Sequence, residues 1–307
     1  IVFIDYSVPN HDQDAGSLAT YLYLKLFLEM GFKVVFIPEN NYKYEPYVSG
    51  LQQMGIEVLY GKAYHLEHHF DWIARNGRYI HYVWLARSNV GMKYLGPLRE
   101  NSKAKIMYCM VDLHYLRELR RYELEKKEEI LGEADKIKEV EMFMFENTDA
   151  VLTYSEKEAA HIRGLFPGKE IVKIPIFFYD NLHEDGSSAI AFEDRTDILF
   201  LGGFAHPPNL DAMEYFIKDI LPLIRSKLPD VNFYIIGSNP PESLTGLVQG
   251  HKGVFMIGYV KDLTPYFLRA RVFVAPLRYG AGVKGKIVTS ISYGVPVVTT
   301  SIGNEGI

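Results

Sequence analysis

The chain has 307 residues, of which 48% are hydrophobic and 23% are charged, which is typical of globular proteins. Its length predicts about two domains, and its net charge of −5 argues against a nucleic-acid partner. The one cysteine, Cys109, excludes an internal disulfide and is typical of the reducing cytosol. No apolar run approaches the ~20 residues of a membrane span, and residues 1–5 read as a strand instead of a signal peptide. We therefore expect a cytoplasmic protein.

The first half of the chain alternates apolar strands with helical segments. Residues 1–6 and 33–38 read as strands around a helix over 16–30, in which leucines recur on one face. The β–α–β unit repeats, which predicts a parallel sheet. Further strands are expected at 57–60, 79–85, 105–111, 150–154 and 171–174, and the charged segment from Glu118 to about Asn147 is expected to be helical.

The second half repeats this pattern after a polar stretch. Residues 181–196 lack periodicity and include Gly186-Ser187-Ser188, so we interpret them as an interdomain linker. Strands are expected near 198–201, 232–236, 254–257, 272–276 and 297–300. The fold class is therefore α/β, with two Rossmann-like, doubly wound parallel-sheet domains over 1–180 and 197–307. In such sheets ligands bind at the carboxyl ends of the strands, so we expect a cleft there.

A glycine loop after the strand at 272–276 is the main functional signal. Gly280, Gly282 and Gly285 break the apolar run, Lys284 and Lys286 lie among them, and a helix follows to about Tyr293. A helix N-terminus with bare backbone N–H groups favours an anion, which predicts a phosphate-bearing ligand. The alternative is an ordinary strand-to-helix connection with two solvated lysines.

The second half also resembles glycosyl transferases group 1, a retaining family of the GT-B fold. The resemblance rests on LFLGGFAHPPN at 199–209, IIGS at 235–238, GYVKDL at 258–263, APLRYGAGVKGK at 275–286 and PVVTTSIGNEG at 296–306. It implies metal-independent transfer of a sugar from a nucleoside-diphosphate sugar to a glycan or lipid-linked glycan, with no cofactor besides the donor. A lipid-linked acceptor would bring the protein to the inner face of the membrane. The family continues beyond residue 307, so we expect the second domain to be incomplete.

The resemblance also implies donor-binding residues. Gly202 and Gly203 fall near the donor phosphate and sugar, and the segment Gly258, Tyr259, Val260 falls near the base. The family's basic pair after the first glycines is replaced by HPPN at 206–209, so positive charge is expected from the glycine loop. The other donor-binding candidates are Gly16, Ser17, Arg278, Gly282, Lys284, Lys286 and Thr289. Asp14 or Ser17 can instead cap the first helix, and Asn209 can be a helix N-cap.

Asp112 and His114 are the catalytic candidates, because they directly follow the strand at 105–111. The resemblance implies that one of them orients a hydroxyl of the transferred sugar, and Arg117 and Arg120 can contact an anionic group. The alternative is a capping Asp112 and a solvated His114.

Two departures from the family motivate a second hypothesis. Glutamates that the family commonly carries fall at Ala281 and Thr289, and Glu305 lies too far along the chain to replace them. A non-catalytic module that binds a sugar nucleotide or a glycan is therefore the alternative function. We expect no metal, since no D-x-D motif is present and His65, His68 and His69 have no further ligands and read as a solvated surface.

Overall fold

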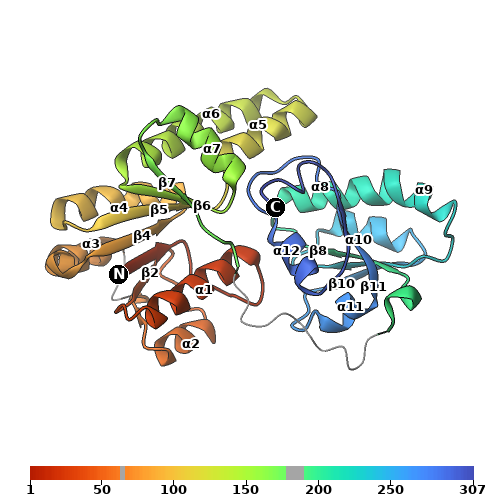
Figure 1. Cartoon of the computed structure of the whole chain (residues 1–307), viewed down its shortest axis with the longest axis horizontal. Helices are drawn as coiled ribbons and strands as arrows, with labels where there is room; N and C mark the ends of the chain where they lie inside the picture. The colour runs from red at the N-terminus through yellow and green to blue at the C-terminus, as the bar shows by residue number, and fades with distance from the viewer. Residues whose placement is uncertain (63–65, 178–189) are drawn as a thin grey trace. The chain divides into compact units, whose positions relative to one another are not determined.

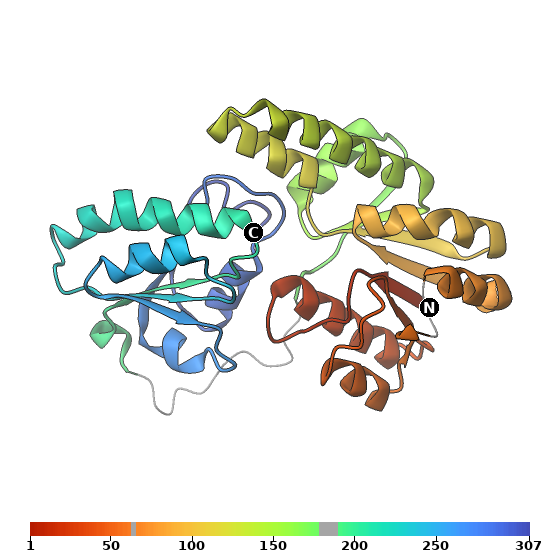
Figure 2. The same cartoon turned by 180° about the vertical axis from the view of Figure 1, so that it is seen from behind.

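The computed structural model describes residues 1–62, 66–177 and 190–307, and Figures 1 and 2 show its elements from two sides. The chain divides into two compact units. The first comprises residues 1–11, 16–176 and 306, and the second comprises 12–15, 177–305 and 307. Most of the expected linker at 181–196, as well as His65, lies outside the described residues.

The first unit contains a seven-stranded parallel sheet in the order β3-β2-β1-β4-β5-β6-β7. This confirms the expected parallel α/β fold. The strands are β1 (Val2–Asp5), β2 (Val35–Pro38), β3 (Glu57–Val58), β4 (Tyr82–Ala86), β5 (Lys105–Met110), β6 (Ala150–Thr153) and β7 (Glu170–Lys173). The helices are α1 (Ala15–Glu29), α2 (Tyr47–Gln53), α3 (Leu66–Asn76), η2 (Gly77–Tyr79), α4 (Ser88–Asn101), α5 (His114–Glu125), α6 (Glu128–Asn147) and α7 (Glu156–Leu165).

Apolar side chains cover both faces of this sheet. On one face, residues of α4, α6 and α7 join the buried cluster around Val83 and Ile106. On the other face, Phe3 stacks on Trp84 with ring centroids 5.2 Å apart, and Tyr23 of α1 packs on the same indole at 4.8 Å. The strands are therefore buried on both sides, which explains why they read as continuous apolar runs.

The segment expected to be helical over 118–147 is helical apart from a short break. It forms two helices, α5 and α6, which separate at Lys126, where the backbone is left-handed with φ of 56°. Neither glycine nor proline marks this break, and charged helix-forming residues lie on both sides of it, so the sequence offers no signal for it. The helix α4 contains Gly96 and Pro97, residues that normally end helices.

The second unit contains a five-stranded parallel sheet in the order β10-β9-β8-β11-β12. The strands are β8 (Asp197–Leu201), β9 (Phe233–Ile236), β10 (Val254–Gly258), β11 (Ala270–Ala275) and β12 (Val297–Thr299), all within two residues of the expected ranges. The helices are η4 (Phe192–Asp194), α8 (Pro207–Tyr215), the π-helical turn η5 (Phe216–Ile220), α9 (Leu221–Arg225), α10 (Glu242–Gln249), α11 (Thr264–Arg269) and α12 (Gly285–Ser292). One buried cluster packs α8 and α10 on the sheet, and another packs α11 and α12.

The strand order fixes where each unit can hold a ligand. In such sheets the order reverses between two neighbouring strands, and a crevice opens at their carboxyl ends. The reversal lies between β1 and β4 in the first unit and between β8 and β11 in the second. The residues that follow these four strands are therefore the first place to look for chemistry.

Candidate functional site

Glycines dominate the carboxyl edge of the second sheet. The Gly202 N–H, just after β8, donates to the carbonyl of Ile236 at 2.9 Å, and the Gly237 N–H donates to the carbonyl of Gly258 at 2.9 Å. A Cβ at Gly237 would lie 2.1 Å from the Gly202 carbonyl oxygen, and a Cβ at Gly202 would lie 2.6 Å from the Lys286 Nζ. Side chains at these two positions would therefore block the close approach of the strand ends and of the lysine.

Lys286 lies in the first turn of α12, the helix that follows the glycine loop. Its ammonium donates to the side-chain oxygen of Asn209 and lies 4.4 Å from the ring centroid of Phe200. No carboxylate of the described residues forms an ion pair with it. Burial, and then the charge of Lys284, lower the pKa of Lys286 to about 7. The site thus holds a cationic group whose charge is not balanced by a carboxylate, as an anion-binding site requires.

Asn209 positions this lysine. The residue lies inside α8, whose N-cap is His206, so the alternative that Asn209 caps the helix is wrong. Its amide nitrogen donates to the Gly203 carbonyl at 2.7 Å while its amide oxygen accepts from Lys286. The sequence reading missed this role, although a polar residue soon after a glycine pair at a strand end is a usable signal.

Lys284 and Arg278 differ from Lys286 in having partners for their charges. The Lys284 Nζ folds back onto its own loop and donates to the carbonyls of Ala281 at 3.0 Å and Gly282 at 2.6 Å. Arg278 pairs with Asp211, with its Nε 3.0 Å from the carboxylate Oδ2. Of the three cations expected to supply positive charge, Arg278 is therefore held by a carboxylate and Lys284 by its own loop, whereas Lys286 bonds to the Asn209 side chain.

The N-terminus of α12 lies beside Lys286. Lys284 occupies the N-cap position of α12, and its side chain makes no capping hydrogen bond. The left-handed backbone of Gly282, with φ of 67°, turns the loop into the helix. Helix N–H groups without a cap attract anions.

The remaining donor-binding candidates lie at different depths. Gly258 ends β10 with φ of 80°, Tyr259 is exposed, and Val260 packs into the apolar cluster under α11. The Thr289 hydroxyl donates to the Gly285 carbonyl at 3.1 Å, one turn back in the same helix. Thr289 therefore uses its proton within the helix, and only its oxygen lone pairs can serve a ligand.

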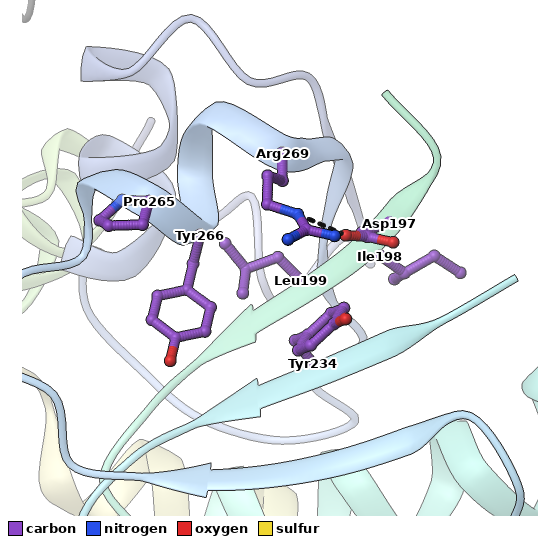
Figure 3. A pocket seen from close by; sticks show the side chains of 7 residues that line it. All are labelled: Asp197, Ile198, Leu199, Tyr234, Pro265, Tyr266 and Arg269. Atoms are coloured by element: carbon purple, nitrogen blue, oxygen red, sulfur yellow. Dashed lines mark ion pairs between the residues drawn. The ribbon is translucent and has the colours of Figure 1, made fainter. Parts of the chain in front are cut away.

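A cavity of about 300 Å³ lies elsewhere in this unit, and Figure 3 shows its lining. Asp197, the first residue of β8, and Arg269 form an ion pair there, with the arginine Nε 3.5 Å from the carboxylate. The cavity is bounded by Tyr234, Pro265 and Tyr266. Because β8 starts at Asp197 and reaches the glycines only after Leu201, this cavity is at the opposite end of the strand from the candidate site.

In the first unit, the strand reversal holds an ion pair between the buried Asp5 and the partly exposed Arg87. The Asp5 carboxylate accepts from Arg87 Nε at 2.8 Å, from the Tyr6 N–H at 2.7 Å and from the Thr20 hydroxyl at 3.1 Å. Arg87 follows β4 and has a φ of 65°, which is rare for a residue with a side chain. The sequence reading missed both residues, although each ends or follows an expected strand.

Asp112 and His114 contact each other at the end of β5. The His114 Nε2 lies 3.0 Å from Asp112, and its Nδ1 lies 3.3 Å from Glu141, a fully buried residue of α6. Burial acts to lower the pKa of His114, but Asp112 and Glu141 together outweigh it and raise the pKa to about 9. His114 is therefore an imidazolium at neutral pH, and the alternative of a solvated histidine is wrong.

Glu141 caps the start of α5, the role that the sequence offered for Asp112. Its carboxylate accepts the backbone N–H groups of His114 at 2.9 Å and Tyr115 at 3.3 Å, at the start of α5. Asp112 instead accepts from Arg117 Nη1 at 3.0 Å. A buried glutamate in this charged helical segment cannot be recognised from sequence, because other glutamates of the same helix, such as Glu139 and Glu146, are exposed.

Gly16 and Ser17 lie within α1, after its first residue Ala15. The Ser17 hydroxyl donates to the Asn10 side-chain oxygen at 2.7 Å, and Ser17 is buried. Ser17 is therefore not the N-cap of this helix.

The expected histidine surface is only partly correct. His68 is exposed, but His69 is fully buried and bonds to the Tyr94 hydroxyl at 2.9 Å and the Leu59 carbonyl at 3.2 Å. Among the described residues, no three or more histidine, cysteine, aspartate or glutamate side chains gather as metal ligands.

Comparison with known proteins finds a family whose model matches the second unit. Residues 195–307 match the model of the family described as glycosyl transferases group 1, the family that the sequence motifs resemble. An uncharacterized 44.6 kDa protein in the cps region of Klebsiella pneumoniae is 28% identical over 117 residues, which are 36% of this chain and 30% of that protein. The chain thus spans less than a third of the length of this relative.

Solved structures extend the similarity to the whole fold. HepE of Anabaena, in complex with UDP and glucose, has a TM-score of 0.68 at 13% identity, over 98% of this chain and 80% of that one. TarM of S. aureus, in complex with UDP and other ligands, has a TM-score of 0.58 at 14% identity, over 78% of this chain and 45% of that one. A glycosyltransferase from Rickettsia africae has a TM-score of 0.67 at 11% identity, over 100% and 79%. The fold is therefore GT-B. Within the described residues, no helix combines the length and the apolarity that crossing a membrane requires.

Proposed function

We propose that the chain transfers a sugar from a nucleoside-diphosphate sugar to a glycan or lipid-linked glycan, with retention at the anomeric carbon and without a metal ion or other cofactor. The observation that supports this most is Lys286, an ammonium in the first turn of α12 without a carboxylate partner among the described residues. It lies in the segment that matches glycosyl transferases group 1. Other solved structures of the same fold contain UDP, which makes UDP the nucleotide we propose first.

The chemistry follows from where charge develops. When the bond between the anomeric carbon and the diphosphate breaks, negative charge grows on the leaving phosphate oxygens. Fixed donors aimed at that position stabilise the transition state more than the ground state. In this proposal Lys286 and the first N–H groups of α12 are those donors. Asn209 holds the ammonium in place, and the missing side chain of Gly202 leaves room for the lysine and for Asn209 beside the strand end.

The protonation state of Lys286 fits a site for a diphosphate. Without a ligand, burial makes the charged form costly, which is why its pKa is lowered to about 7. A bound diphosphate adds opposite charge beside the ammonium and restores the charged form. We propose that the energy of donor binding thus depends on proton uptake by this lysine.

Asp112 and His114 have a different role in the proposal. His114 has both ring nitrogens against carboxylates and a pKa of about 9, so it cannot accept a proton at neutral pH. We assign it as a fixed positive charge that, with Asp112, orients a hydroxyl of the sugar. The acceptor hydroxyl then attacks the face that the diphosphate leaves, as proposed for the retaining family. The new bond to the anomeric carbon forms as the bond to the diphosphate breaks, and the hydroxyl proton passes to the leaving phosphate oxygen.

Thr289 favours a second candidate function. At this position, where the family commonly has a glutamate, the threonine hydroxyl is engaged within its own helix. Fewer hydrogen bonds to the donor favour a protein that binds a sugar nucleotide or glycan without turnover.

Turnover separates the two functions. The protein is incubated with UDP-glucose, UDP-galactose, UDP-N-acetylglucosamine, GDP-mannose and dTDP-glucose in the presence of glycan acceptors, and release of the nucleoside diphosphate is followed. We expect release from at least one UDP-sugar, and an axial or equatorial product linkage that matches the donor. Binding of UDP without any release in the whole panel would favour the non-catalytic module.

A further inference from the structure

A cluster of aromatic side chains lies at the carboxyl edge of the first sheet. His11 follows β1 and stacks on Tyr21 of α1, with ring centroids 4.1 Å apart and planes at 15°. Tyr47, which begins α2, meets the same imidazole edge-on at 5.5 Å. Tyr44 lies 5.1 Å from Tyr47, and Tyr42 lies 6.1 Å from Tyr44. We call these five residues the tyrosine cluster.

The backbone holds the tyrosine cluster at the strand ends. The loop between β2 and α2, residues 39–46, starts where the Glu39 and Asn40 N–H groups donate to the carbonyls of Asp5 and Tyr6, both at 2.8 Å. The Gly61 N–H, after β3, donates to the Asn41 carbonyl at 3.0 Å. The loops after three neighbouring strands are thus joined. This is the edge at which doubly wound sheets bind ligands.

The tyrosine cluster is only partly used for packing. Tyr42 is 64% exposed, and the other four members are half-buried. The inner core of this face is instead made by Phe3, Phe36 and Trp84. The stacked and edge-on contacts among His11, Tyr21 and Tyr47 restrict these rings, so little side-chain freedom remains to be lost on binding.

The charges of the loop at 39–46 form ion pairs. Lys43 pairs with Glu45, with the Nζ 3.0 Å from the carboxylate, and Glu39 pairs with Lys93. Lys43 also lies 6.0 Å from the ring centroid of Tyr60. These are the charged residues of the loop at 39–46, so this loop offers a strongly charged ligand little net attraction. Its binding chemistry consists of aromatic faces and phenol hydroxyls.

We propose that the tyrosine cluster binds a neutral sugar ring of the acceptor glycan. A pyranose ring has one face of C–H groups with partial positive charge, which complements the negative face of an aromatic ring, and a rim of hydroxyls that phenol groups can bond. This inference rests on the proposed function, and it names the acceptor as an oligosaccharide recognised through its sugar and not through a lipid or a phosphate.

The test measures sugar and nucleotide binding separately. Saturation-transfer NMR with maltohexaose, cellohexaose and chitohexaose gives the affinity for neutral glycans, and calorimetry with UDP gives the affinity for nucleotide. We expect at least one hexasaccharide to bind the parent protein and its Kd to rise about three- to tenfold in Tyr42→Ala. Tyr42→Phe, which keeps the ring, should retain most of the affinity.

Tyr79→Ala is the matched control. Tyr79 is 63% exposed, almost the same as Tyr42, but it precedes β4 and so lies at the amino ends of the strands. We expect Tyr79→Ala to leave glycan affinity unchanged. The inference is overturned when no hexasaccharide binds, or when Tyr79→Ala weakens binding as much as Tyr42→Ala does.

Two further outcomes show whether the tyrosine-cluster proposal or the proposed function is wrong. Co-sedimentation with phosphatidylethanolamine–phosphatidylglycerol vesicles tests the tyrosines as a membrane surface. Loss of vesicle binding in Tyr42→Ala without any glycan binding would replace the sugar by a lipid surface and overturn the inference. UDP binding without glycan binding would refute the tyrosine cluster alone, whereas absence of UDP binding would refute the proposed function.

Discussion

Replacing Lys286 with methionine tests the stability cost of the proposed phosphate site. Methionine has a similar length and no charge, and it fits beside the Phe200 ring that the lysine already contacts. The lowering of the lysine pKa from 10.5 to about 7 corresponds to roughly 5 kcal/mol at 1.36 kcal/mol per unit. Because Lys286 is only partly buried, solvent screening reduces this value, and we expect Lys286→Met to stabilise the ligand-free protein by about 1–3 kcal/mol at pH 6.

The pH dependence gives this prediction its sign. The folded state holds the lysine proton less tightly than the unfolded state, so it binds fewer protons between pH 7 and about 10.5. The stability of the parent protein therefore rises with pH through this window relative to the variant. The gain from Lys286→Met should be complete below pH 7 and should vanish toward pH 10.5.

Urea unfolding of both proteins at pH 6, 8 and 9.5 measures this difference. Lys218→Met is the control, because Lys218 is exposed and pairs with Glu214 at 2.9 Å on the helix surface. It should change stability by under about 0.5 kcal/mol at each pH. UDP affinity should fall at least about tenfold in Lys286→Met only. A variant that is less stable than the parent at pH 6, or a difference that does not change with pH, would refute the reasoning.

Three further predictions address other parts of the site. EDTA should leave UDP affinity unchanged, as the proposal uses no metal, and a loss beyond about threefold would contradict it. Gly202→Ala would place a Cβ 2.6 Å from the Lys286 Nζ, so it should lower the stability by about 1–3 kcal/mol and also lower the UDP affinity. Gly246→Ala on α10 is the control, because a Cβ there would have nothing within 4 Å, and it should lower neither quantity. The raised pKa of His114, about 9, means that its stabilising contribution is complete below pH 6.5 and lost as pH rises through 9. His114→Gln should therefore lower the urea-unfolding free energy by about 1–3 kcal/mol at pH 6 and by little at pH 10, and a difference independent of pH would count against the imidazolium.

The sequence predicted the fold well because both sheets are parallel and buried on two faces. Each strand is then a short apolar run. A glycine follows the last residue of β8 (Leu201) and of β9 (Ile236), and a glycine is the last residue of β10. The same glycines led directly to the loop before α12 and to Lys286. This loop could be recognised from sequence because its backbone conformation requires glycines, and this requirement does not depend on a contact with a distant segment.

The parts that were missed depend on contacts between distant segments. The buried carboxylate of Glu141 meets His114 from 27 residues along the chain, and Asp5 meets Arg87 from 82 residues away. His69 resembles a surface histidine until the Tyr94 hydroxyl and a strand carbonyl are placed around it. Neither composition nor periodicity records such pairs, so the charge state of His114 followed only from the structure.

Calorimetry of UDP binding at pH 8, in two buffers with different ionisation enthalpies, tests the central claim most directly. The difference between the two heats counts protons taken up on binding. UDP is almost fully ionised at this pH, since its last phosphate pKa is about 6, whereas free Lys286, with a pKa of about 7, is about one-tenth protonated. If the diphosphate binds beside Lys286, the parent protein should take up about 0.9 proton per UDP, Lys286→Met should take up almost none, and uridine should bind both proteins with equal, weaker affinity. Binding of UDP by the parent without proton uptake, or uridine binding as tight as UDP binding, would contradict the account.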